Sequence, residues 1–451
     1  MISPHKLSIK INKFISFLSD NIKFLFLFYI LAQCVLLFRF PVQYVSDSAY
    51  YWKLAHDSIR ANGFYPLPHQ IFDDIIIAPL YINLIIVLLK IYNSTLTIGL
   101  YNIILNSLQL YLLYNIVSRM FNKKTAVVAS LFFMLSLNNI GMVAVNLTEL
   151  SYTTLLLLSI YFYLKDGKAN LLAAGIFCGA SIAVRPLGWA LFAAYIIILL
   201  IIHPQGKLIR NISFVTLGLA SFIIVFGSVI KLSSGYFIYT SSTGPINILM
   251  SANDNASGGF LPIQSDYKGG PGYISGGDTL TFRQKQDIMA GRAVSWIKNH
   301  PVKWISLIPA KIVLLFRWDD ITVSRLVSPD FNYQTFLKLI KHDPTVTRTY
   351  SIGFLLLWAF LLIFHHMFYY AGLIFFIYGL FRFRKDILKN SDILMLLVYA
   401  VAGIGMTMVA DADVRFKYPY MFVIFTCNAF FIIEILKLNL LMGREVIPPV
   451  Q

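Results

Sequence analysis

The sequence predicts an all-α integral membrane protein, a multi-span helical bundle of about ten full spans plus two re-entrant or interfacial helices. Of its 451 residues, 58% are hydrophobic and 13% are charged, whereas soluble domains carry roughly 25% charged residues. The mean hydropathy is +0.70. Long apolar runs recur along nearly the whole chain, which excludes an ordinary soluble fold.

The apolar runs and the polar interruptions between them set the predicted elements. A full span needs about 20 residues, and some of the runs are shorter. A first outer loop and a Gly-, Ser- and Asn-rich extracytoplasmic loop, residues 39–74 and 232–302, separate them. We expect a transmembrane module over 1–231 and another over 303–451. The apolar runs are 22–38, 75–92, 96–117, 125–145, 147–164, 170–184, 187–203, 208–231, 303–318, 352–380, 391–410 and 416–440.

The basic clusters fix the predicted topology. If every run before residue 232 crossed the membrane, the large loop would be cytoplasmic and Arg119–Lys124 would lie outside, against the positive-inside rule. A re-entrant 75–92 segment, with Pro79 near its start, removes both conflicts. By the same parity, residues 303–318 stay at the outer interface. We therefore expect both termini in the cytoplasm.

The charge and the cysteine content argue against a nucleic-acid-binding protein and against a disulfide-bonded or metal-binding one. The net charge of +16 follows from basic cytoplasmic loops, so no nucleic-acid partner is expected. Cys34, Cys178 and Cys427 are odd in number and lie in apolar runs, which predicts packing residues and neither disulfides nor a metal site.

The most informative polar feature follows the first apolar run. Asp47, Tyr51 and Ala55 are four residues apart and would share one face of a helix over Ser48–Ala61. An acid at the membrane surface is costly unless it is solvated, paired or used. The simpler alternative is that Asp47 only caps this helix.

Glu149 and Arg185 are two further polar residues that the topology places on the outer side. Glu149 begins an apolar helix, where an early acid is also a normal helix start. Arg185, before Pro186, lies between two apolar runs, where it needs either an ionic partner or an interface to reach.

The outer start of the last run carries Asp411, Asp413, Arg415 and Lys417. Positive charge outside opposes the orientation bias, and a phosphate partner explains it because guanidinium presents a planar fork to phosphate oxygens. The alternative is an ion pair with one of the two acids. Lys311 would either reach a lipid phosphate or serve in packing or snorkelling at the outer interface.

These residues together resemble the GT-C glycosyltransferases that use lipid-phosphate sugars, similar to the protein O-mannosyltransferase and aminoarabinose transferase families. The resemblance covers most of residues 22–440, although Ser48 stands where such proteins often carry a second acid. The motifs are Asp47 with Tyr51, Ala55 and Gly63; Pro79-Leu80-Tyr81; Thr148-Glu149; Gly175, Gly179 and Arg185-Pro186; His300-Pro301 with Lys311; and Arg415-Phe416-Lys417-Tyr418-Pro419.

The resemblance implies a GT-C fold and an inverting displacement, in which an acceptor hydroxyl replaces polyprenyl phosphate at the anomeric carbon. It implies Asp47 as the base, with Glu149 orienting a substrate or pairing with an arginine. Four basic residues would hold the phosphate: Arg185, Arg415, Lys417 and Lys311. Four further residues would contact the donor or the acceptor: Tyr50, Tyr51, Asp411 and Asp413.

We also expect no metal or other cofactor, a polyprenyl-phosphate-linked sugar as donor, and a glycan, lipid or protein acceptor. The expected location is a bacterial inner membrane with a periplasmic active site. A lipid-linked-glycan polymerase or ligase, a lipid-linked-sugar transporter and a non-enzymatic assembly subunit remain as alternatives. Acids and bases collected on one face count against transport, which usually places its site at the membrane midplane.

Overall fold

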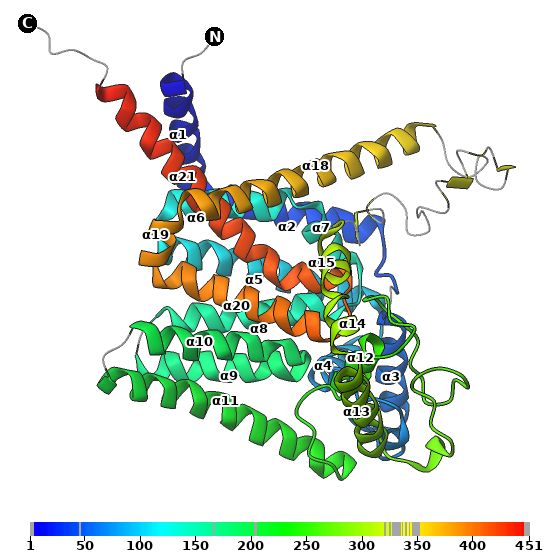
Figure 1. Ribbon diagram of the computed structural model, residues 1–451. Coiled ribbons are helices and arrows are strands. Elements are labelled where there is room, and N and C mark those ends of the chain that lie inside the picture. The colour runs from blue at the N-terminus through cyan, green and yellow to red at the C-terminus, as the bar shows by residue number, and fades with distance from the viewer. Residues whose placement is uncertain are drawn as a thin grey trace, which may run out of the picture.

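The computed structural model is an all-helical bundle (Figure 1). It describes residues 4–44, 47–165, 167–202, 205–319 and 352–445, and isolated residues between 322 and 344. Within these ranges there is no named strand, and the sole extended pairing is a bridge between Gln43 and Val145. The predicted all-α class is confirmed.

Almost every predicted apolar run forms a helix. The long polar 232–302 segment also contains helices, which the sequence analysis did not predict. In chain order the elements are α1 (Pro4–Asp20), α2 (Ile22–Arg39), α3 (Ser48–Arg60), η1 (Pro68–Phe72), α4 (Pro79–Ile91), α5 (Thr95–Met120), α6 (Lys123–Leu135), α7 (Leu137–Gly141), η2 (Met142–Ala144), α8 (Thr148–Tyr163), α9 (Lys168–Val184), η3 (Pro186–Gly188), α10 (Trp189–Ile202), α11 (Gln205–Ser234), α12 (Gly244–Ser251), η4 (Gly277–Thr279), α13 (Phe282–Asn299), α14 (Pro301–Ile305), α15 (Ile308–Phe316), α18 (Ile352–Arg382), α19 (Arg384–Lys389), α20 (Ser391–Val409), η6 (Val414–Tyr420) and α21 (Met421–Glu445).

The predicted count of ten full spans is not confirmed. Among the described residues, 6 helices are long and apolar enough to cross a membrane, or 7 if the α6–α7 pair, bent by 62°, counts as one span. The shortfall comes from length, because α8, α9 and α10 have 16, 17 and 14 residues, about 21–26 Å of helix. The expected partial segments are shorter still: α4 has 13 residues and α15 has 9.

Close helix contacts in the bundle depend on glycine. A Cβ on Gly175 of α9 would lie 2.0 Å from the Val215 carbonyl oxygen of α11, and one on Gly218 would lie 2.1 Å from the Leu172 carbonyl oxygen. Small residues that let two backbones touch are typical of helix pairs in membranes. The α9–α11 contact therefore holds the chain just before Arg185 against a long spanning helix.

The two ends of the bundle differ in charge and in loop structure. At one end the α5 terminus meets the α8 terminus, where Arg119 Nη1 donates to the Leu164 carbonyl at 2.9 Å. The short basic helix α19 follows at the same end in Figure 1. At the opposite end α3, α4, α12 and α13 gather around the start of η6 (Figure 1).

The 232–302 segment is a small helical unit with its own core. Thr281 and Gln284 form a capping box at the start of α13, a recognisable start signal. Buried side chains of α12 and α13, including Leu249 and Met289, form an apolar cluster separate from the main core. The 232–302 segment is consequently a folded unit and not an irregular loop.

Candidate functional site

A cavity of about 880 Å³ opens where the first outer loop, η3, the 241–266 chain and the start of η6 meet. Pockets for small ligands commonly measure about 300–1,000 Å³. Predicted site residues from three distant parts of the sequence form its wall. They are Asp47, Tyr50, Tyr51, Arg185, Asp411 and Arg415.

Asp47 is paired across the cavity wall. It precedes α3, but among the described residues its side chain makes no capping hydrogen bond. Instead Arg415 Nη2 lies 2.7 Å from Asp47 Oδ2, and the Tyr51 hydroxyl donates to the same oxygen at 3.4 Å. The capping alternative therefore does not describe this carboxylate, which is 36% exposed.

Arg415 is fixed by the turn that carries it. The Asp413 carboxylate accepts the Arg415 backbone N–H at 2.9 Å, which starts η6. The guanidinium is 15% exposed and lies 5.4 Å from the centre of the Phe416 ring. Its Nε and Nη1 are buried and find no hydrogen-bond partner in the described part of the chain.

Arg185 approaches the same ring from α9. Its backbone is extended (φ −145°, ψ 132°), as the residue before a proline prefers, and its guanidinium lies 5.5 Å from the Phe416 ring centre. Arg185 Nη2 is 3.1 Å from Glu149 Oε1. Its Nη1 is buried without a partner among the residues described.

Glu149 stands behind Arg185. It lies in the first turn of α8, is 1% exposed, and is absent from the cavity wall formed by the described residues. A carboxylate buried this deeply needs a cation or several donors. Glu149 thus orients Arg185 and does not meet a ligand directly.

The two guanidinium groups lie against one aromatic ring beside the cavity, and each keeps buried N–H groups that find no hydrogen-bond partner among the residues described. Guanidinium binds phosphate through paired, charge-assisted hydrogen bonds. Flat contact with an aromatic ring orients the guanidinium while leaving its edge free. This arrangement is suited to an anionic group, next to the only partly buried carboxylate of Asp47.

Lys311, Lys417 and Asp413 do not join the cavity wall that the described residues form. Lys311 is fully buried on α15 and donates to the Met408 carbonyl at 2.6 Å; burial lowers its pKa to about 8. Lys417 is also fully buried, with its Nζ 3.3 Å from Asp319 Oδ1. Asp413 serves as the cap of η6.

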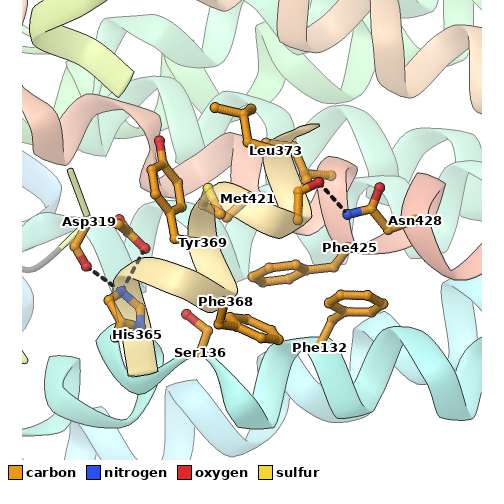
Figure 2. Close-up of a pocket in the computed structure, with 12 residues that line it drawn as sticks. Phe132, Ser136, Asp319, His365, Phe368, Tyr369, Leu373, Met421, Phe425 and Asn428 are labelled. Atoms are coloured by element: carbon orange, nitrogen blue, oxygen red, sulfur yellow. Dashed lines mark hydrogen bonds and ion pairs between the residues drawn. The ribbon is translucent and has the colours of Figure 1, made fainter. Parts of the chain in front are cut away.

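Lys417 and Asp319 belong to a polar network between α18 and the core. Figure 2 shows Asp319 turned toward His365, whose Nε2 is 3.4 Å from Asp319 Oδ2. The adjacent cavity measures about 10 Å³, room for about one water and no sugar. This network joins η6 to Asp319 and α18, and its cavity is too small for a sugar.

Sequence reasoning missed how the 232–302 segment attaches to the first outer loop. Asp74 accepts hydrogen bonds from Lys285 Nζ at 2.9 Å and from the Ser265 backbone at 2.9 Å, and Gln286 donates to its carbonyl at 2.8 Å. The Asp73-Asp74 pair was the available signal. Its neighbour Asp73 lines the cavity half buried, and burial raises the pKa of its carboxyl.

The described residues contain no group of three or more His, Cys, Asp and Glu side chains arranged to hold a metal. Metal independence stays a prediction.

Comparisons with known proteins address the family. Residues 77–230 match the model of the dolichyl-phosphate-mannose-protein mannosyltransferase family. No curated protein sequence matches the chain.

Among solved structures, the chain is similar to an oligosaccharyltransferase of Archaeoglobus fulgidus. The apo form matches with 13% identity and a TM-score of 0.48 over 93% of this chain and 51% of that chain. The form tethered with an acceptor peptide containing the NVT sequon matches with 15% identity and a TM-score of 0.47, over 92% and 50%. The chain spans about half the length of these structures.

The family match covers α4 through α11 and therefore includes Glu149 and Arg185, while Asp47 and Arg415 lie outside it. It agrees with the resemblance carried by the sequence motifs. Residues 77–230 are thus similar to a family of membrane glycosyltransferases of the GT-C type.

Proposed function

We propose that this protein transfers a sugar from a polyprenyl-phosphate donor to an acceptor hydroxyl on the extracytoplasmic face of a membrane, with inversion at the anomeric carbon. The observation that carries the proposal is the cavity wall where the Asp47 carboxylate meets Arg415, beside Arg185. A base and fixed positive charge are the two elements that displacement of a lipid phosphate requires.

The reaction is a single displacement. The acceptor oxygen forms a bond to the anomeric carbon while the bond from that carbon to the phosphate oxygen breaks, and its electron pair stays on the phosphate. Asp47 takes the proton of the acceptor hydroxyl. The products are the glycoside and polyprenyl phosphate, whose charge Arg185 and Arg415 stabilise.

Donor binding changes the partners of Asp47. In the structure Arg415 Nη2 occupies Asp47 Oδ2 at a distance of 2.7 Å. A donor phosphate competes with Asp47 for Arg415. Once the phosphate takes the guanidinium, Asp47 becomes available to the acceptor, so the donor binds first.

The orientation follows from charge. The end of the bundle with Arg119 and α19 is basic, and basic ends favour the cytoplasm. The cavity lies at the opposite end and faces the periplasm if the membrane is a bacterial inner membrane. Lys311 and Lys417 are no longer required as phosphate ligands, because both are engaged inside the protein.

Purified protein in lipid, supplied with polyprenyl-phosphate sugars and a membrane extract as acceptor source, tests the proposal. We expect release of polyprenyl phosphate together with a glycosylated product of inverted configuration. If diphosphate-linked donors are consumed and monophosphate-linked donors are not, the protein is a polymerase or ligase. Donor movement across the bilayer without bond cleavage would identify a transporter.

A further inference from the structure

Asp411 is a buried acid at the cavity that neither the base nor the phosphate site uses. It lies between α20 and η6, lines the cavity and is 5% exposed. Its Oδ1 is buried and has no hydrogen-bond partner within the described ranges. Leaving a buried charged acceptor without a donor is costly, which indicates that a ligand supplies one.

The chain on both sides of Asp411 is held by the 232–302 segment. Ser251 Oγ donates to the Ala410 carbonyl at 2.7 Å, and the Ala412 N–H donates to the Gly258 carbonyl at 3.0 Å. Gly258 has φ +93°, which side-chain-bearing residues rarely adopt, and a Cβ there would lie 3.1 Å from Lys311 Cγ. The turn is thus positioned before any ligand binds, as a selective site requires.

The position of Asp411 matches the expected position of the sugar. Arg415 lies four residues further along the chain and lines the same cavity. A sugar joined to the phosphate through its anomeric carbon must lie beside the arginines that hold that phosphate. The phosphate itself is repelled by a carboxylate, so the donor group that meets Asp411 belongs to the sugar.

We propose that Asp411 recognises the transferred sugar by accepting a hydrogen bond from a sugar hydroxyl or ammonium group. This inference rests on the proposed function and assigns the sugar subsite within it.

The surroundings of Asp411 give this recognition a pH dependence. Burial raises the pKa of its carboxyl to about 6, an effect that Arg415 and Lys311 oppose and Asp413 adds to. The carboxylate predominates above pH 6 and is lost as the pH falls through that value. The contribution of the sugar to donor affinity should fall over the same interval.

The experiment measures binding of two lipids to the full-length protein in nanodiscs: a polyprenyl-phosphate sugar, and methyl polyprenyl phosphate as the bare lipid, a phosphodiester that carries the same single charge and no sugar. The difference between their dissociation constants reports the sugar subsite. In the native protein we expect the sugar to tighten binding about tenfold or more, the effect of a hydrogen bond to a charged group. Asp411→Asn should remove most of that gain and leave affinity for methyl polyprenyl phosphate within twofold.

The controls separate this inference from other roles. Asp57→Asn changes a partly exposed carboxylate on α3 that pairs with Arg60 outside the cavity wall described, and should keep the full sugar gain. A neutral-sugar donor and an amino-sugar donor distinguish a hydroxyl from an ammonium partner. Repeating the titration from pH 7.5 to 5 should erase the gain in native protein and leave the variant unchanged.

Two results would overturn the inference. One is equal loss of affinity for both lipids in Asp411→Asn, which would make the residue structural or phosphate-directed. The other is a native protein that binds the bare lipid as tightly as every sugar-bearing lipid. Absence of turnover with intact, sugar-dependent binding would instead count against the proposed reaction.

Discussion

Replacing Asp47 with asparagine should lower turnover and at the same time strengthen donor binding. Asparagine keeps the size of the side chain and an oxygen that can accept from Tyr51, but it cannot take a proton. Loss of a general base typically costs about 10²- to 10⁴-fold in rate. We therefore expect kcat to fall by that range.

The gain in binding follows from the Asp47–Arg415 ion pair. The oxygen–nitrogen distance is 2.7 Å, with the aspartate 36% and the arginine 15% exposed. A pair this accessible contributes on the order of 1 kcal/mol or less. Removing the carboxylate releases Arg415 and relieves repulsion of the phosphate, so the dissociation constant should fall by up to about fivefold.

The measurements are single-turnover release of polyprenyl phosphate and equilibrium binding of the same donor, both in nanodiscs. Asp57→Asn is the matched control. It neutralises another acid, on the helix that follows Asp47, and Asp57 is not among the described residues that line the cavity. Unchanged turnover in Asp47→Asn would refute Asp47 as base. Weaker donor binding in that variant would refute competition for Arg415.

Three further predictions concern Arg415, Lys417 and the side of the membrane on which Ser257 lies. Arg415→Ala should weaken donor binding more than Arg415→Lys does, since lysine keeps the charge and loses the fork; equal losses measured by titration would contradict a paired phosphate contact. Lys417→Met should destabilise the protein by about 3–5 kcal/mol, measured by unfolding in detergent, and adding Asp319→Asn should restore part of that loss. A cysteine at Ser257, which is exposed, should react with impermeant reagent only from the extracytoplasmic side, and labelling from the cytoplasm would reverse the proposed orientation.

Helices were predictable from this sequence where apolar length alone decides them. The run 96–117 became α5 and the run 170–184 became α9, each within a few residues. The span count was less predictable, because 14–17 apolar residues can end short of the opposite surface without any change in composition. The helix α13 was missed because its apolar face is narrow, although Thr281 and Gln284 marked its start.

The gathering of the site was predictable at the level of residue type. Asp47, Arg185 and Arg415 stand out as charges in apolar or outer contexts, and the structure brings them to one cavity. The sequence could not tell which lysines were engaged elsewhere. Lys417 is two residues from Arg415, yet η6 turns it away to Asp319, a partner that carries no local signal.

The two acid–arginine pairs at the cavity are alike in contact and differ in what they permit. Glu149 is 1% exposed and lies behind Arg185, so separating them would leave a buried charge without compensation, at a cost of several kcal/mol. Asp47 is 36% exposed, and its carboxylate can exchange arginine for water or an acceptor at little cost. The pairing with Glu149 therefore fixes Arg185, whereas the pairing with Asp47 leaves Arg415 able to change partners. For this reason we propose Asp47 as the base, and Glu149 as the residue that holds Arg185 in the proposed phosphate site.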